Sequence, residues 1–248
     1  MARTSAPKTV VPKTVASKNI ITLKVTLRGA KPPVWRRLVM PGTMTLADLH
    51  QAIQAAMGWH DSHLHAFDIG GEQYGDQHSV DDVYDENRVT LNGLLRSPVV
   101  RFTYTYDFGD NWEHTVAFEK SEAALERASY PVCITGKRNC PPEDCGGVWG
   151  YEELLAILAD PTHPEHAERI DWLGEAFDPD KFDLERANTM LANRFRKNSR
   201  RPTSHPAAKP RDVSNYFRSS RLPLVIFTPP LCCIFHLCSV EIRRRPCL

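Results

Sequence analysis

Alternating hydrophobic and polar positions predict strands in the first half of the chain. From Ile20 to Arg28 every second residue is apolar, which is typical of a strand buried on one face. Val34 to Met40 predicts a second strand, and prolines bound it on both sides. His63 to Ile69 resumes the alternation. Two more strands, Val99 to Tyr106 and Trp112 to Glu119, flank a short polar turn and predict a hairpin.

Helical periodicity separates these strands and returns in the last third of the chain. Apolar residues from Leu46 to Met57 fall on one helical face, with Thr45 as the N-cap and Gly58 as the stop. Three further helices are predicted at Tyr151 to Leu158, Glu165 to Leu173 and Leu184 to about Phe195. The pattern predicts an α+β fold with an antiparallel-rich sheet, one helix after the first two strands and a C-terminal group of helices.

Charge divides the 248 residues into three parts. Residues 1–18 carry four basic groups and no acids, residues 19–193 carry 15 basic and 28 acidic groups, and residues 194–248 carry 12 basic and 2 acidic groups. We expect a folded domain at 19–195, a basic disordered N-terminus at 1–18, and a linker with an unstructured or aberrant basic and apolar tail at 196–248. An acidic domain disfavours nucleic acid, which would have to bind through the basic ends.

Composition and motifs narrow the function classes. The N-terminus has no apolar signal segment, and prolines interrupt the apolar run of the tail, so we predict a cytoplasmic protein without a membrane span. The seven cysteines show no disulfide spacing.

No phosphate-binding glycine loop and no nucleophile elbow occurs. We therefore expect a protein or peptide partner for the acidic domain, and the sequence leaves its oligomeric state and any cofactor open.

The turn between the hairpin strands is the first candidate site. The side chains of its aspartates and asparagine can accept hydrogen bonds from nearby backbone N–H groups of the turn, which is a purely structural role. Alternatively, the turn and its aromatic neighbours form a binding edge. The candidate binding residues are Tyr104, Tyr106, Asp107, Asp110, Asn111 and Trp112.

Histidines and cysteines supply two candidate metal sites. His63 and His65 lie two apart on a predicted strand, so both would project to one face. With the turn they form a candidate divalent-metal set: His63, His65, Asp107, Asp110 and His114. The alternative is that the histidines are partly buried and hydrogen-bonded.

Three cysteines in a loop predicted from Tyr130 to Gly150 could hold zinc with a distant fourth ligand. They are Cys133, Cys140 and Cys145. The alternative is that they pack as small hydrophobic residues. Glu143 and Asp144 in this loop are interpreted as helix-capping or solvent-facing acids.

Three ordered motifs carry a family resemblance. They are the segment from Trp59 to Phe67, the hairpin sequence Tyr-Asp-Phe-Gly-Asp-Asn-Trp-Glu-His from Tyr106 to His114, and the Cys133 to Gly147 loop. Together they resemble the plasmid pRiA4b ORF-3-like domain family, whose members also occur as passenger proteins of insertion sequences. The resemblance runs from about Ile20 to Phe195. It implies a compact α+β domain with an antiparallel-rich sheet and implies no particular reaction.

Three hypotheses for function follow. The first is a non-catalytic cytoplasmic binding or accessory module of mobile-element type, which uses the aromatic edge beside the turn. The second is a metal-dependent hydrolase, for example a phosphodiesterase or nuclease, in which a metal-bound water is the nucleophile. The third is a DNA-binding accessory protein that acts through its basic ends. Convergence of the turn with the three imidazoles would favour the second.

Overall fold

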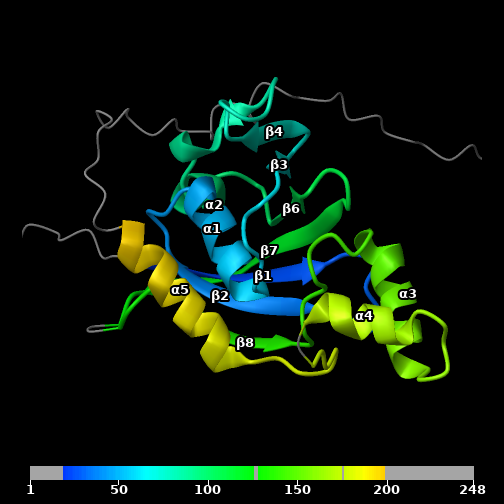
Figure 1. Ribbon diagram of the computed structural model, residues 1–248. Coiled ribbons are helices and arrows are strands. Elements are labelled where there is room, and N and C mark those ends of the chain that lie inside the picture. The colour runs from blue at the N-terminus through cyan, green and yellow to red at the C-terminus, as the bar shows by residue number, and fades with distance from the viewer. Residues whose placement is uncertain (1–18, 126–127, 175, 199–248) are drawn as a thin grey trace, which may run out of the picture.

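A computed structural model describes residues 19–125, 128–174 and 176–198 (Figure 1). The expectations for residues 1–18 and 199–248, including DNA binding through the basic ends, fall outside this part of the chain. Each helix within the described ranges is too short or too polar to span a lipid bilayer.

The described residues form one sheet in the order β5-β4-β3-β6-β7-β1-β2-β8. Its strands are β1 (Asn19–Leu27), β2 (Trp35–Pro41), β3 (His65–Ile69), β4 (Glu72–Gly75), β5 (Tyr84–Asp85), β6 (Arg101–Tyr106), β7 (Trp112–Ala123) and β8 (Val132–Lys137). Every neighbouring pair is antiparallel except β4 and β5. The predicted antiparallel-rich sheet is confirmed.

The helices follow the predicted order. They are α1 (Leu46–Met57), α2 (Leu91–Leu95), α3 (Gly147–Ala159), α4 (His166–Leu173) and α5 (Leu184–Asn198), with a short 3₁₀ helix at Glu86–Arg88. Thr45 and Asp48 form a reciprocal capping box at the start of α1, and Gly58 ends the helix with φ +96°. The predicted α+β class, with a helix after two strands and a C-terminal group of helices, is confirmed.

Strand β8 corrects the predicted loop from Tyr130 to Gly150. Cys133 lies in this edge strand, and the side-chain amide of Asn188 on α5 bonds both its backbone groups, at 2.8 Å to the N–H and 2.9 Å to the carbonyl. The side chain thus supplies the hydrogen bonds that another strand would make. Only six residues form the strand, and glycine interrupts its alternation, so the pattern gave a weak strand signal.

The main core lies between the sheet and the two helices α1 and α5, which cover one face of β1, β2 and β8 (Figure 1). Alternate residues of β1, such as Leu23 and Val25, and the apolar stripe of α1, including Leu49, are fully buried there. Each such side chain stabilises the fold by about 1.5–3 kcal/mol. Helices α3 and α4 pack on each other to one side.

A buried arginine fixes the end of α1. Arg36 of β2 is 2% exposed, and its guanidinium donates to the carbonyl oxygens of Ala56, Trp35 and Lys137 at 2.9–3.1 Å. The guanidinium also stacks 4.2 Å from the centre of the Phe182 ring. Burial lowers the pKa of Arg36, but a guanidinium stays charged at neutral pH. The arginine therefore ties α1 to β8 immediately before the chain enters the candidate site.

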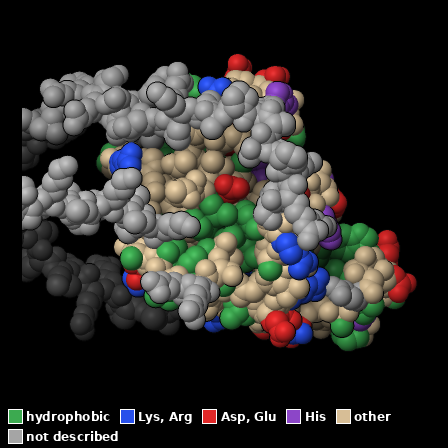
Figure 2. All heavy atoms as spheres, turned by 90° about the vertical axis from the view of Figure 1, so that its left-hand side faces the viewer, with side chains coloured by type: hydrophobic (Ala, Val, Ile, Leu, Met, Phe, Trp, Pro, Cys, Tyr) green, Lys and Arg blue, Asp and Glu red, His purple; other side chains and the backbone are tan. Residues whose placement is uncertain are grey.

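The surface is not uniformly polar. On the face that Figure 2 shows, hydrophobic side chains gather near the centre, and Lys and Arg side chains lie beside them.

Candidate functional site

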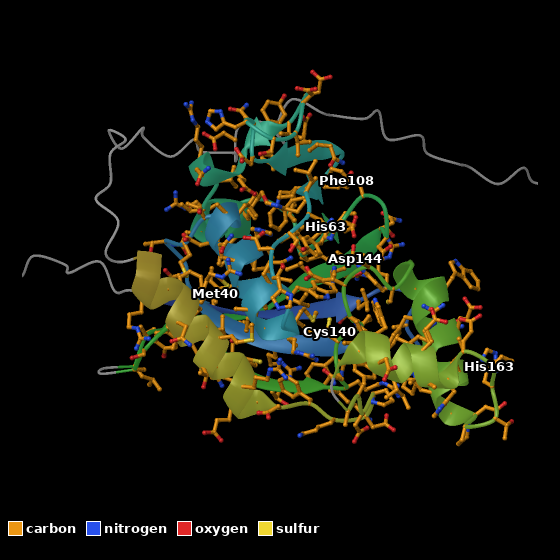
Figure 3. All side chains as sticks on the ribbon, viewed as in Figure 1. Met40, His63, Phe108, Cys140, Asp144 and His163 are labelled. Carbon is orange, nitrogen blue, oxygen red and sulfur yellow. The ribbon has the colours of Figure 1, made fainter. Side chains whose placement is uncertain are left out.

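Three connecting segments meet beside the ends of β3 and β6. They are residues 58–64 between α1 and β3, residues 107–111 between β6 and β7, and residues 138–146 between β8 and α3. Figure 3 shows His63, Asp144 and the exposed Phe108 close together here, whereas His163 lies far away near the helical pair α3 and α4. The first two segments were predicted to contribute to one site, and the third contains Cys140 and Cys145 of the separate predicted zinc site.

The β6–β7 turn directs Asp107 into the site. Asp107 and Asn111 have φ values of +57° and +53°, which short polar side chains tolerate better than most. The N–H of Asp107 donates to the carbonyl of Leu64 at 2.8 Å, and its Oδ1 accepts from the N–H of Gly109 at 2.9 Å. One carboxylate oxygen therefore orders the turn, and Oδ2 remains for His63.

Close packing of the β6–β7 turn against the start of α3 brings Asp144 to the same place. Oδ2 of Asp110 accepts from the N–H of Gly146 at 3.2 Å, so Asp110 serves this contact. A side chain at Gly147 would place its Cβ 2.4 Å from the carbonyl oxygen of Asp110, which only glycine avoids. Asp144, with φ +59°, stands just before this contact.

The imidazole of His63 lies between the two carboxylates. Its Nε2 is 3.1 Å from Oδ1 of Asp144 and 3.7 Å from Oδ2 of Asp107. That nitrogen is shielded from solvent and makes no hydrogen bond of ordinary geometry. Among the described residues this is the one group of three His, Cys, Asp or Glu side chains whose ligand atoms converge, all within 4.8 Å of one another.

These distances suit a shared cation. A zinc ion lies about 2.1 Å from imidazole and carboxylate ligands, so tetrahedral ligand atoms lie about 3.4 Å apart. The separations from His63 lie on either side of that value. One imidazole and two carboxylates also match the ligand preference of manganese and iron. The set can hold a divalent metal ion with coordination positions to spare.

A polar network surrounds the three residues. Glu143 accepts from Nδ1 of His60 at 2.8 Å, from the backbone N–H of His60 and from the hydroxyl of Tyr106. The same hydroxyl accepts the N–H of Ser62 at 2.9 Å and that of His63 at 3.3 Å. Burial, and then the bond to Glu143, raises the pKa of Tyr106, so the phenol stays protonated.

His65 lies in a different cluster, which corrects its predicted role as a ligand beside His63. Strand β3 begins only at His65, and His63 lies in a bend before it, so the two histidines do not share one strand face. Nε2 of His65 is 2.8 Å from Oε2 of Glu86, and its ring stacks 3.5 Å from that of His50. The predicted alternative of a buried, hydrogen-bonded histidine is what the structure shows for His65.

The stacked histidines continue into a second polar cluster around Asp61. Nε2 of His50 lies 2.7 Å from Oδ1 of Asp61, and Arg194 of α5 lies 3.2 Å from Oδ2. Although burial alone would raise it, the pKa of Asp61 falls to about 2 because His50, Gln51 and Arg194 stabilise the carboxylate. Burial lowers the pKa of His50. This cluster fixes the start of the segment that carries His63.

Comparison with known proteins identifies the family. The model of the plasmid pRiA4b ORF-3-like protein family matches residues 19–186. The chain belongs to this family. The pRiA4b ORF-3-like chain is 38% identical over 192 residues to the uncharacterized protein y4hQ of Sinorhizobium fredii, covering 75% of this chain and 98% of that protein.

A solved structure supports the same assignment. The pRiA4b ORF-3-like chain is similar to the crystal structure of MM3350, a protein of unknown function from Methanosarcina mazei Go1, with 41% identity and a TM-score of 0.62. The match covers 68% of this chain and 97% of that one. These comparisons establish family and fold, and neither relative's name states a reaction.

The prediction that aromatic side chains of the hairpin form an accessible binding edge is wrong for this pRiA4b ORF-3-like protein. Tyr104, Tyr106 and Trp112 are fully buried, because the face of the hairpin that carries them packs into the core. Asp110 and Asn111 of the predicted binding set remain at the turn. The exposed apolar residues beside the site are instead Phe108 and Leu64, at 48% and 45% exposure.

His114 corrects a second predicted ligand. It is fully buried on β7, with the Trp59 ring edge-on at 5.4 Å, and lies outside the converging group. Neither ring nitrogen makes a hydrogen bond of ordinary geometry, although the backbone of Trp112 and Tyr104 lies close. Burial lowers the pKa of His114 to about 4, so the ring is neutral at physiological pH.

The three cysteines do not form the alternative zinc site. Cys133 and Cys140 are buried in the core as free thiols, and Cys145 is a free, partly buried thiol packed against it. Burial raises the pKa of Cys140 and of Cys145 to about 12, which keeps both protonated. The cysteines are absent from the converging group of the described residues. Their packing fits the predicted alternative of small hydrophobic residues.

Asp144 and Glu143 lie at the candidate site, although the sequence did not predict them as site residues. Both were interpreted as capping or solvent-facing acids, and Asp144 is indeed exposed. The signal that could have drawn attention to them is their place inside the third family motif. Their convergence with His63 depends on packing between distant segments.

A groove of about 800 Å³ lies on the opposite face of the sheet. It runs along outward-facing residues of β1, β2, β7 and β8, such as Thr22, Val39 and Ile134, with the ion pair of Arg37 and Glu119 in its wall. None of its lining residues belongs to the converging group. The groove and the candidate metal site are therefore separate features.

Proposed function

We propose that this domain binds a divalent transition-metal ion through His63, Asp107 and Asp144. The observation that carries the proposal is the solvent-shielded Nε2 of His63, which faces two carboxylates without an ordinary hydrogen bond. Calcium prefers six to eight oxygen ligands, whereas imidazole with carboxylates suits zinc, manganese and iron. Zinc and manganese are therefore the first ions to test.

A simple ion pair is the competing explanation. A protonated His63 between the carboxylates of Asp107 and Asp144 would also give short nitrogen–oxygen distances. The two explanations differ in their response to metal. A ligand set binds an ion with defined stoichiometry and gains stability from it, whereas an ion pair does neither.

Metal analysis of untagged protein tests the proposal. We expect close to one equivalent of zinc or manganese after incubation and gel filtration, and a higher melting temperature with excess metal. His63→Ala should abolish both effects. His163→Ala, which removes a partly exposed histidine distant from the site, should retain both (Figure 3). Equal binding by His63→Ala and the wild type would contradict the assignment.

Metal-assisted hydrolysis is the activity that the arrangement supports best. Three protein ligands leave coordination positions open, as in catalytic rather than structural zinc sites. A bound ion would supply a Lewis acid and lower the pKa of water. Asp110 and Glu143 add carboxylates beside the ligands. Because this negative charge would repel a phosphodiester, we propose an uncharged ester or amide substrate in preference to the phosphodiester.

Turnover measurements separate this activity from the non-catalytic alternative. Metal-loaded protein should hydrolyse an activated carboxylic ester faster than an activated phosphodiester, and Asp144→Asn should lower that rate by at least tenfold. If metal binds and no ester or amide is turned over, the domain is a binding module. Its partner would then be a protein or peptide that contacts the exposed Phe108 and Leu64.

The proposed location is the cytoplasm. Cys133 and Cys140 are free thiols, and free thiols are typical of a reducing compartment.

A further inference from the structure

One phenol hydroxyl connects all three segments that carry the proposed ligands. The hydroxyl of Tyr106 accepts the backbone N–H of Ser62 at 2.9 Å and that of His63 at 3.3 Å. It also donates to Oε1 of Glu143. Tyr106 itself directly precedes Asp107, and Glu143 directly precedes Asp144. The backbone of His63 is therefore bonded to the Tyr106 hydroxyl, and Asp107 follows Tyr106 in the sequence. Asp144 follows Glu143, which accepts a hydrogen bond from the same hydroxyl.

Packing fixes the position of the Tyr106 ring and therefore of its hydroxyl. The ring is fully buried and packs 5.0 Å from the ring of Trp59. Trp59 in turn donates from its indole N–H to the carbonyl of Pro141 at 2.9 Å. The hydroxyl thus projects from a packed core to the point where the three segments meet, so its position is set independently of any ligand.

Tyr104 provides an internal comparison. It lies two residues earlier on β6, faces the same core, and is equally buried. Among the described residues its hydroxyl bonds His50 at 2.9 Å and Gln54 at 3.1 Å, both on α1. It makes no bond to a ligand-bearing segment in that part of the chain. The two tyrosines therefore share burial and strand position but differ in what their hydroxyls hold.

We propose that Tyr106 is the positioning residue of the metal site, and this inference rests on the proposed function. Its hydroxyl sets the distance of His63 and Asp144 from Asp107 before an ion arrives. Outer groups that orient metal ligands typically change metal affinity by 10–100-fold. The effect should appear in affinity for the ion rather than in the fold.

Tyr106→Phe and Tyr104→Phe form the matched test. Each removes one buried hydroxyl and keeps the ring, so both should fold. We expect Tyr106→Phe to weaken Mn²⁺ or Zn²⁺ binding 10–100-fold in isothermal titration calorimetry. Tyr104→Phe should change affinity less than threefold, even if it lowers the melting temperature. Equal affinities for Tyr106→Phe and the wild type would overturn the inference while leaving the proposed function intact.

A double-mutant cycle tests the route through Glu143. Glu143→Gln removes the charge that accepts the phenol proton and should also weaken metal binding. If Tyr106 acts partly through Glu143, the loss in the double variant is smaller than the product of the two single losses. Independent, fully multiplicative losses would contradict that coupling. A wild-type protein that binds neither ion would overturn the proposed function and this inference together.

Discussion

Nε2 of His63 lies 3.1 Å from Oδ1 of Asp144, although the two residues belong to segments far apart in the chain. Two contacts produce this approach. Gly147 packs against the carbonyl of Asp110, and Glu143 bonds both His60 and Tyr106. The candidate site is therefore a product of tertiary packing, and its proposed chemistry depends on the segments staying in contact.

Asp107 should separate metal binding from folding. Its φ of +57° is tolerated by asparagine but strains most other residues. Asp107→Asn should keep the turn, since its side-chain oxygen can still accept from Gly109, and should lose metal affinity at least tenfold. Asp107→Ala should lose the same affinity and, in addition, about 1–2 kcal/mol of unfolding free energy.

Calorimetry and chemical denaturation of the two Asp107 variants provide the comparison. If Asp107→Asn retained wild-type affinity, Asp107 would not be a ligand. If both variants were equally stable, the backbone at this position would not require the conformation that the structure shows.

Replacing the buried Arg36 should destabilise the fold even when the positive charge is kept. Arg36→Lys cannot reproduce the bonds to Ala56, Trp35 and Lys137 or the stacking on Phe182. We expect a loss of about 2–4 kcal/mol in urea denaturation. Arg28→Lys alters a surface pair with Glu113 and should change stability by less than about 0.5 kcal/mol. Similar losses for both would contradict the structural role of Arg36.

His114 should make stability depend on pH between about 4 and 6.5. Burial lowers its pKa from 6.5 to about 4 in the folded state, so the unfolded state binds a proton first as pH falls. The contribution of the neutral His114 ring to the free energy of unfolding is complete above pH 6.5 and is lost progressively towards pH 4. The loss over this interval is about 3 kcal/mol.

His114→Leu removes that titration and keeps an apolar side chain in the core. Its unfolding free energy should vary less with pH between 4 and 6.5 than that of the wild type, by about 3 kcal/mol. His163→Leu, at a partly exposed histidine, is the control and should preserve the wild-type dependence. An unchanged pH profile for His114→Leu would show that His114 is not the titrating group.

The fold could be predicted largely because local patterns agree with tertiary packing. Sequence patterns predicted three of these features, namely the alternation in β1, the capping residues of α1 and the β6–β7 hairpin. Strand β8 was missed because its backbone bonds are completed by Asn188 of α5, which no local pattern reveals. Edge elements of this kind depend on their neighbours.

The converging group of His63, Asp107 and Asp144 was predictable only in part. Asp107 and His63 were predicted as ligands because turn acids and imidazoles are ordinary metal ligands. His65 was misplaced because β3 begins only at His65, so the assumed strand alternation does not extend back to His63. Asp144 was missed because its approach depends on the fit between Gly147 and Asp110. His114 was misassigned because alternation gives the face of a strand and not what covers it.

Titration of chelator-treated, untagged protein with Mn²⁺ and Zn²⁺ distinguishes a metal site from an ion-pair cluster. We expect one ion per chain for the wild type and for His163→Ala, and at least a hundredfold weaker binding for His63→Ala and Asp144→Ala. Equal affinities in all four proteins, or no binding by the wild type, would show that His63, Asp107 and Asp144 form an ion pair cluster and not a metal site.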